Sequence, residues 1–136
     1  MRSLGLDIGD RRIGVALSDP DGILASPLTI INRSDESLDI EAIIDIVKSQ
    51  DVGRVIVGLP HSLDGSLGEQ AEKVKAFTRK LASRIQVPLE YRDERLTTVM
   101  AERLGRAAGS KKTKRKARYD AQAAALILQG YLDEGH

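Results

Sequence analysis

The sequence predicts an α/β protein with one mixed sheet flanked by helices. Three short apolar segments separated by turn residues come first, and they are typical of an antiparallel meander. Helical and strand-like patterns then alternate, which indicates parallel strands joined by helices. The 136 residues have the size of one domain, and neither a linker nor an internal repeat divides them, so we expect a single domain over 1–136.

The meander comes from the first third of the chain. Strands are expected over 3–8 and 13–18, the second of which ends at the turn residues 19–22. A third strand, about 23–31, contains Pro27, which suits an edge position because proline cannot donate a ladder hydrogen bond.

The rest of the chain alternates between helix and strand. A helix is expected between Ser34, as its N-cap, and Gln50. Its apolar positions recur at helical spacing: Leu38, Ile40, Ile43, Ile44, Ile46 and Val47. The later elements are a buried strand over 54–59, a helix over 67–84, a strand over 88–92, a helix from Thr97 or Thr98 to Leu104 and a helix over 117–132.

Composition excludes several kinds of chemistry. The chain has no cysteine, so disulfides, thiol catalysis and cysteine-bound zinc are ruled out, and its two histidines argue against a histidine-rich metal site or a Ser-His-Asp triad. With 3% aromatic residues it does not resemble RNA-binding modules that stack bases on exposed rings. It has no apolar run of about 20 residues and no signal-peptide pattern, so we expect a cytoplasmic protein without a membrane partner.

Four acidic residues lie where chemistry is expected. Asp7 is inside an apolar strand, Asp93 and Glu94 directly follow the last predicted strand, and Asp120 is near the start of the last helix. Each has a structural alternative: a bond to a turn for Asp7, plain exposure for Asp93 and Glu94, and a favourable helix-dipole position for Asp120. Carboxylates without histidines suit Mg²⁺ or Mn²⁺, which can activate water for phosphodiester cleavage.

The charge distribution favours a polyanionic partner. Residues 103–118 hold eight of the 21 Lys and Arg residues and none of the 20 Asp and Glu residues, although the net charge of the chain is only +1. The alternative is a solvated, mobile loop without a partner. Within this stretch, residues 111–116 are expected to form a loop that is mobile without substrate and becomes ordered on a phosphate backbone. The candidate phosphate-binding residues are Arg11, Arg95, Lys111, Lys112, Lys114, Arg115, Lys116 and Arg118.

Five motifs follow one another in a familiar order. They are Gly5–Gly9 with Arg12–Ala16, Val57–Pro60, Asp64–Ser66, Asp93–Thr98 and Asp120–Ala124. The chain thereby resembles the YqgF (RuvX) family, described as nucleases of precursor 16S rRNA and as similar to Holliday junction resolvases. The resemblance implies a ribonuclease H-like fold with a five-stranded sheet of order 3-2-1-4-5. It also implies a catalytic triad of Asp7, Glu94 and Asp120 that binds Mg²⁺ or Mn²⁺.

Two details of the resemblance leave alternatives open. Neighbouring strand residues point to opposite faces, so Asp93 and Glu94 are not expected to bind one metal together, and Asp64 is a reserve candidate. The family commonly has an asparagine where this chain has Ser62, and His61 beside it is a candidate proton carrier.

The function implied by the resemblance is a metal-dependent nuclease that processes the 5′ end of precursor 16S rRNA during ribosome biogenesis. One alternative is a resolvase of branched or single-stranded DNA, which would require a homodimer to cut two strands. A second is a non-catalytic nucleic-acid-binding assembly factor. A phosphotransferase of the actin-like fold is a weaker alternative, because that fold needs two lobes and this chain has the length of one.

Overall fold

A computed structural model of the chain describes residues 1–60, 68–94 and 113–135, with only the backbone described for 113–120. Its elements, in chain order, are β1 (Arg2–Ile8), β2 (Arg12–Ser18), β3 (Ala25–Asn32), α1 (Glu36–Ser49), β4 (Val52–Leu59), α2 (Glu69–Ala82), β5 (Leu89–Asp93) and α4 (Thr113–Asp133). Within the described ranges, no helix is both long enough and apolar enough to cross a membrane.

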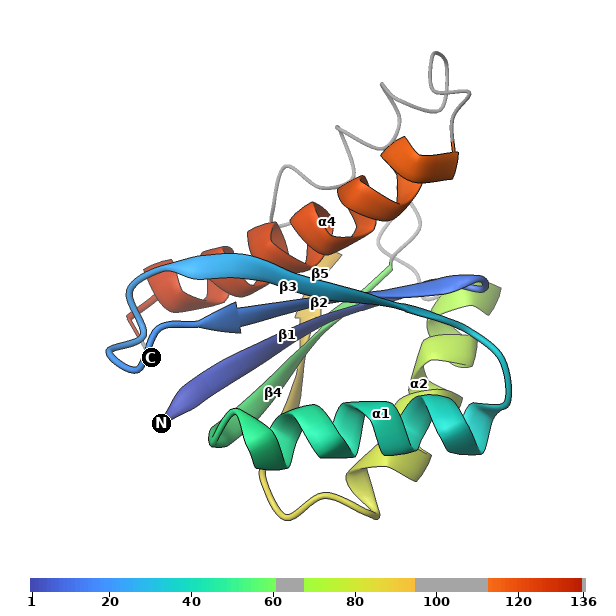
Figure 1. The fold of residues 1–136 in the computed structure, drawn as a ribbon, viewed down its shortest axis with the longest axis horizontal. Helices are drawn as coiled ribbons and strands as arrows, with labels where there is room; N and C mark the ends of the chain where they lie inside the picture. The colour runs from blue at the N-terminus through green and yellow to red at the C-terminus, as the bar shows by residue number, and fades with distance from the viewer. Residues whose placement is uncertain (61–67, 95–112, 136) are drawn as a thin grey trace.

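The five strands form one mixed sheet in the order β3-β2-β1-β4-β5 (Figure 1). The meander pairs β1 with β2 and β2 with β3 in antiparallel fashion, whereas β1, β4 and β5 run parallel. The predicted mixed sheet and its order 3-2-1-4-5 are therefore confirmed. Pro27 lies in the edge strand β3, where the register with β2 shifts between Val15 and Ala16.

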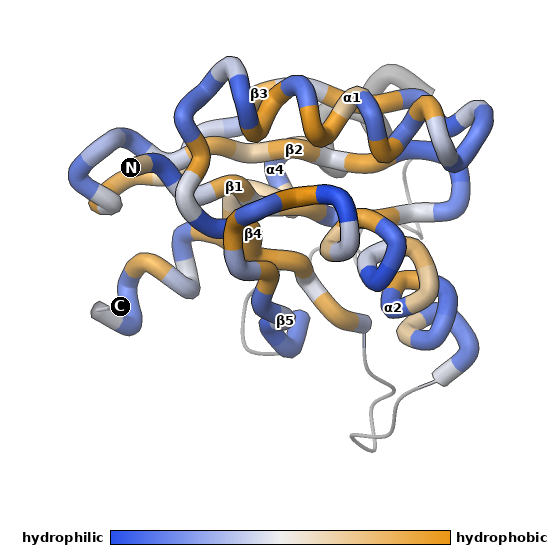
Figure 2. Tube along the Cα trace, turned by 90° about the horizontal axis from the view of Figure 1, so that it is seen from below, coloured by the Kyte–Doolittle hydropathy of each residue, from blue (hydrophilic) through white to orange (hydrophobic). Residues whose placement is uncertain are grey.

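Helices cover both faces of this sheet. α1 and α2 lie on one face and α4 lies on the other, and Figure 2 shows hydrophobic residues along the central strands between them. The alternation of side chains along β1 sends Leu4, Leu6 and Ile8 into the larger core under α1 and α2. Gly5 faces α4, because a Cβ atom there would lie 2.8 Å from the Cβ of Leu128.

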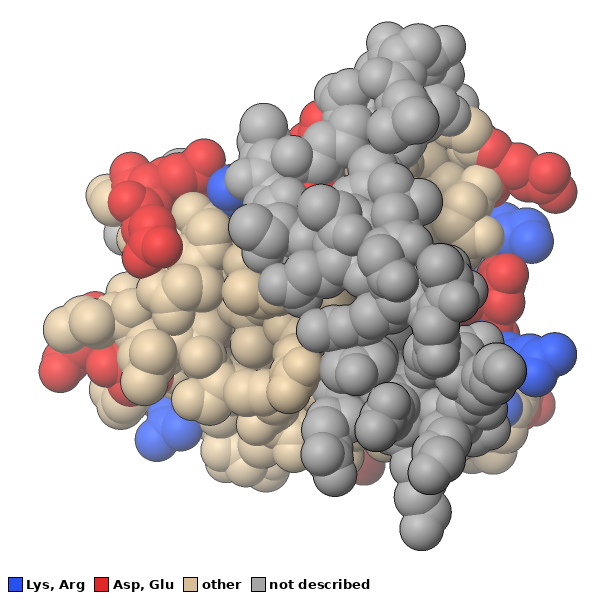
Figure 3. Space-filling model, turned by 90° about the horizontal axis from the view of Figure 1, so that it is seen from above, with Lys and Arg blue, Asp and Glu red and all other residues tan. Residues whose placement is uncertain are grey.

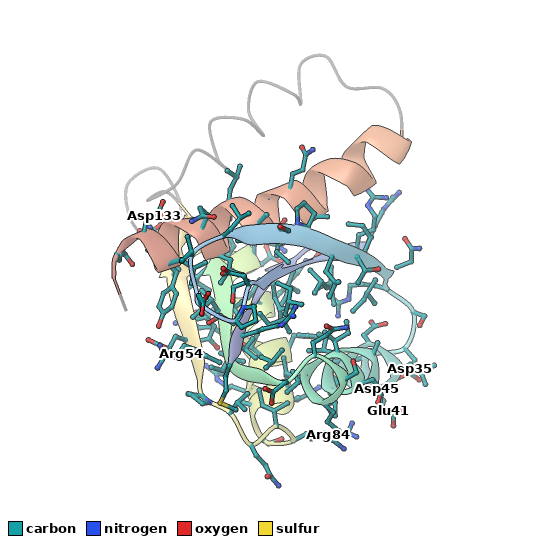
Figure 4. All side chains as sticks on the ribbon, turned by 60° about the vertical axis from the view of Figure 1, so that its left-hand side comes forward. Asp35, Glu41, Asp45, Arg54, Arg84 and Asp133 are labelled. Carbon is teal, nitrogen blue, oxygen red and sulfur yellow. The ribbon has the colours of Figure 1, made fainter. Side chains whose placement is uncertain are left out.

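The start of α1 differs from the prediction. Its N-cap is Asp35, not Ser34, and the Asp35 carboxylate accepts the backbone N–H of Ser37 at 2.8 Å. The N–H of Ser34 instead donates to the buried carboxylate of Asp39 at 3.2 Å, which holds Ser34 outside the helix. Leu38, expected on the apolar face, is 58% exposed. Arg84, which follows the end of α2, lies 3.8 Å from Glu41 of α1 (Figure 4).

The third strand begins at Ala25 rather than near Ile23. The Asp19 carboxylate accepts the backbone N–H groups of Ile23 and Leu24, at 2.7 and 3.1 Å, and so holds both residues in the turn. These two hydrogen bonds stabilise the charged carboxylate and lower the pKa of Asp19 below its usual value.

The last helix begins at Thr113, four residues before the predicted start. The expectation that residues 111–116 form a mobile loop is therefore wrong for residues 113–116, which are helical. Lysine, arginine and alanine have high helix propensity, so such a run can extend a helix despite its charge. The helix predicted between Thr97 or Thr98 and Leu104 lies outside the described residues.

Candidate active site

A pocket opens where the three parallel strands end. Because β1, β4 and β5 run in the same direction, their carboxyl ends meet at one edge of the sheet, which is where α/β proteins usually bind ligands. The pocket has a volume of about 200 Å³. The described residues that line it are Asp7, Ile8, Gly9, Gly58, Pro60, Gln70 and Glu94.

Two of the predicted acids, Asp7 and Glu94, lie in this pocket. Asp7 is 6% exposed and Glu94 is 3% exposed, so both carboxylates are removed from bulk water. Asp7 lies two residues after Gly5 and therefore on the face of β1 that α4 covers. A buried carboxylate is costly unless other groups compensate its charge, and carboxylate oxygens are ligands of hard divalent cations, so this pair is a candidate cation site.

The alternation along β5 separates Glu94 from Asp93. The hydroxyls of Tyr91 and Thr78 lie 2.5 Å apart, so Tyr91 faces α2. Arg92 instead packs against Gly130 of α4, since a Cβ atom at Gly130 would lie 2.9 Å from an Arg92 guanidinium nitrogen. Glu94, two residues after Arg92, reaches the pocket, whereas the half-buried Asp93 is absent from its lining.

The backbone of α4 brings Asp120 toward the same edge. Gly5 lies against Ala124 and Leu128, and near the other end of the helix Tyr131 bonds to Arg54 of β4. Arg54 is paired with Ser3, at the beginning of β1, so α4 runs antiparallel to β1. Asp120 precedes Ala124 by one turn, about 6 Å along the helix, and so lies toward the carboxyl end of β1 where Asp7 is.

The described side chains do not complete a metal site alone. Among them, no group of three or more His, Cys, Asp or Glu residues could hold a metal ion. The side chain of Asp120 is not among those described, and Asp64, His61 and Ser62 also lie outside the described residues. Asp7 and Glu94 are therefore the part of the predicted triad whose side chains the structure brings together.

A charged network supports the turn beside the pocket. Arg33 donates from Nη1 to the carbonyl oxygen of Gly9 at 3.1 Å, and its Nε lies 3.4 Å from a carboxylate oxygen of the buried Asp39. The guanidinium group also stacks 4.8 Å from the centre of the Phe77 ring. Because Gly9 lines the pocket, this network fixes the backbone that follows Asp7.

The candidate phosphate-binding residues are described unevenly. Arg11 is exposed in the turn between β1 and β2, two residues after the pocket residue Gly9. Four of the others are on the first turns of α4, with only their backbone described: Lys114, Arg115, Lys116 and Arg118. Arg95, Lys111 and Lys112 lie outside the described residues. On the part of the α4 side that Figure 3 draws in colour, charged groups lie at the margins and uncharged ones between them.

Gln70 is a pocket residue that the sequence analysis missed. It lies in the first turn of α2 and is half-buried. Its position in the sequence could have indicated this role. The helix that follows β4 begins near the carboxyl edge of the sheet, where α/β proteins usually bind ligands.

A second polar cluster lies at the opposite end of the sheet. Arg54, labelled in Figure 4, donates to the Tyr131 hydroxyl, which in turn donates to the Glu90 carboxylate at 3.2 Å. Burial is the main cause that raises the pKa of Tyr131, and the negative charge of Glu90 adds to it. This cluster ties α4 to β4 and β5 and takes no part in the pocket.

The chain is similar to known proteins over its whole length. Residues 1–134 match the family model RuvX, described as Holliday junction resolvase. It is 46% identical over 135 residues to a protein of Desulforamulus reducens, covering 99% of this chain and 98% of that one. It is 48% identical over 134 residues to a protein of Thermoanaerobacter pseudethanolicus, covering 98% and 96%. Both carry the name "Putative pre-16S rRNA nuclease".

Two solved structures share the fold at low sequence identity. RuvC of T. thermophilus in complex with a Holliday junction substrate has a TM-score of 0.64 at 16% identity, covering 99% of this chain and 97% of that one. The Holliday junction resolvase of fowlpox virus has a TM-score of 0.54 at 12% identity, covering 98% and 99%. These likenesses concern the arrangement of strands and helices, which is ribonuclease H-like.

Proposed function

Because the chain belongs to the RuvX family and is a nuclease, a hydrolase of phosphodiester bonds, we propose that it is metal-dependent and processes the 5′ end of precursor 16S rRNA. The name shared by its close relatives supports the substrate. A cytoplasmic location and a single nuclease domain over 1–136 are part of the same proposal.

The observation that carries the proposal is the pair of buried carboxylates in one pocket. Asp7 and Glu94 would repel each other when both are charged, and a divalent cation bound between them removes that repulsion. Among the described residues, the pocket offers carboxylate and amide oxygens, which are the ligands that Mg²⁺ and Mn²⁺ prefer. The residues present therefore fit a hard divalent cation.

Each part of the chain then has a role in cleavage. Asp7, Glu94 and Asp120 hold the cation, which when bound activates a water molecule and stabilises the leaving oxygen. Gly58 and Pro60, at the end of β4, form the wall of the pocket between them. Arg11 and the basic residues at the start of α4 bind the phosphates on either side of the cut.

A second candidate function is resolution of branched DNA. The family description, Holliday junction resolvase, favours it, and symmetric cutting of a junction would require a homodimer. Single-stranded DNA is a further substrate of the same chemistry. The two functions predict different substrate preferences and different oligomeric states.

One experiment tests the metal, the substrate and the site together. End-labelled precursor 16S rRNA and a four-way DNA junction are incubated side by side with wild type and Asp7→Asn, in Mg²⁺, in Mn²⁺ and with a chelator. We expect metal-dependent cleavage of the RNA by wild type and none by Asp7→Asn. The variant should remain folded and at least as stable without metal, because it loses one of two repelling charges.

Three outcomes of this experiment contradict the proposal. Cleavage that persists in the chelator would exclude the metal, and full activity of Asp7→Asn would remove this residue from the site. Preference for the junction, together with a dimer in solution, would favour the second function.

A further inference from the structure

We propose that the side-chain amide of Gln70 binds the scissile phosphate, donating a hydrogen bond from Nε2 to one of its non-bridging oxygens. The proposal rests on the nuclease function proposed above and assigns a substrate contact in its pocket. Gln70 shares that pocket with Asp7 and Glu94, and it is the one residue of α2 in the lining.

Gln70 approaches the pocket from a different direction than the acids. Asp7 is on the sheet face covered by α4, and Glu94 follows a strand whose Arg92 packs against the same helix. Gln70 comes from α2, which covers the other face (Figure 1). The pocket therefore spans the edge of the sheet, with carboxylates on one side and an amide on the other. A phosphate seated across this edge can contact a cation held by the acids and Gln70 at the same time.

The chemistry of the lining also points to Gln70. Apart from the two acids, the described side chains of the lining are those of Ile8, Pro60 and Gln70, with Gly9 and Gly58 contributing backbone. Among these, Gln70 alone carries a side-chain hydrogen-bond donor. Within the described residues, no hydrogen bond to its amide is found, so the donor is available to a ligand.

An amide suits this place better than a positive charge. A lysine or arginine beside Asp7 and Glu94 would pair with them and compete with the cation. A neutral N–H group binds the anionic phosphate without that competition. Hydrogen bonds to charged groups are among the stronger ones in proteins, so their loss is measurable in the rate.

The test compares Gln70→Leu with wild type in single-turnover and steady-state cleavage of one labelled RNA whose cut position is mapped. We expect kcat/KM to fall about 10- to 100-fold, mostly in kcat, because charge develops on the phosphate in the transition state. The Mn²⁺ concentration for half-maximal binding to the free protein should change less than about twofold, since the acids are untouched. Gln50→Leu, the same change at a half-buried position at the end of α1, is the matched control and should behave as wild type.

A modified substrate distinguishes a direct hydrogen bond between Gln70 and the phosphate from a purely structural role of Gln70. Sulfur is a poor hydrogen-bond acceptor, so replacing the contacted non-bridging oxygen by sulfur removes the interaction from the substrate side. If the contact exists, the loss caused by Gln70→Leu should shrink to less than about threefold on one of the two sulfur diastereomers. An equal loss on both diastereomers and on the normal substrate would show that Gln70 only supports the fold of the pocket.

Two further outcomes overturn the proposal. Gln70→Leu with wild-type activity would show that no contact is made. Gln70→Glu with wild-type activity would show that the residue acts through its oxygen, because a carboxylate cannot donate and should repel the phosphate. Wild type that does not cleave with metal would refute the proposed function and this contact with it, whereas active wild type with an active Gln70→Leu variant would refute the contact alone.

Discussion

Replacing Gly5 by alanine should destabilise the protein, although the same change in an open strand would stabilise it. Gly5 lies in the middle of β1, directly under α4. An added Cβ atom would lie 2.8 Å from the Cβ of Leu128 and 2.9 Å from the carbonyl oxygen of Ala124. Neither atom is the end of a flexible side chain, so the helix and the strand must move apart.

The size of the effect follows from this geometry. Carbon atoms pack best at about 3.5 Å or more, so the contact with Leu128 is short by roughly 0.7 Å. Overpacking of this kind costs about 1–3 kcal/mol of unfolding free energy. A strand glycine in open space would instead gain about 0.5–1 kcal/mol on replacement by alanine, because alanine loses less conformational entropy on folding. The change in unfolding free energy therefore has opposite signs at the packed position Gly5 and at an open strand position.

Thermal unfolding followed by circular dichroism measures that sign. For a chain of this length, 1 kcal/mol corresponds to about 3.5 °C, so the midpoint should fall by about 4–10 °C. Cleavage should also decline at temperatures where the variant is fully folded, because the displaced α4 carries Asp120 away from Asp7. A midpoint equal to or above that of wild type would refute the close packing of α4 on β1.

Three other predictions concern the site, the substrate and the second polar cluster. Glu94→Gln should reduce cleavage at least about tenfold more than Asp93→Asn, because only Glu94 lines the pocket; the reverse order of kcat values would reassign the role. Alanine at the three lysine positions 112, 114 and 116 of the basic stretch 103–118 should weaken RNA and DNA binding alike. In a metal-free salt titration, this variant should flatten the log–log slope by about two to three units, and an unchanged slope would place the phosphates elsewhere. The pKa of Tyr131 is raised above 10.0 in the folded state, so its contribution to stability is complete below that pH and is lost as the pH rises further. In urea unfolding at increasing alkaline pH, Tyr131→Phe should therefore lose stability less steeply than wild type, and parallel curves would contradict this assignment.

Local patterns were sufficient for most of the strands. β1, β2 and β4 begin only one or two residues before their predicted starts. These predictions are close because an apolar run between turn residues is a local feature of the sequence. Helix boundaries were less predictable. Ser34 and Asp35 are both good N-caps, and the choice between them was made by Asp39, which binds the N–H of Ser34.

The start of α4 shows that charge patterns, too, do not fix where a helix begins. A basic run can form a loop or the first turns of a helix, since its residues have good helix propensity and its charges are tolerated where solvent screens them. Composition therefore indicated a polyanionic partner for this stretch, but it did not indicate the backbone that presents it.

Residue types and their order are enough to predict which chemistry is available: carboxylates at strand ends, no cysteine, few histidines and a basic stretch. The sequence also carried the family motifs, from which Asp7, Glu94 and Asp120 are predicted as metal ligands. The folded structure was needed to show that Asp7 and Glu94 line one pocket while Asp93 does not, and that Gln70 joins them from the opposite face. The physical reason is that side-chain alternation and helix packing act across the sheet, between residues that the linear sequence keeps far apart.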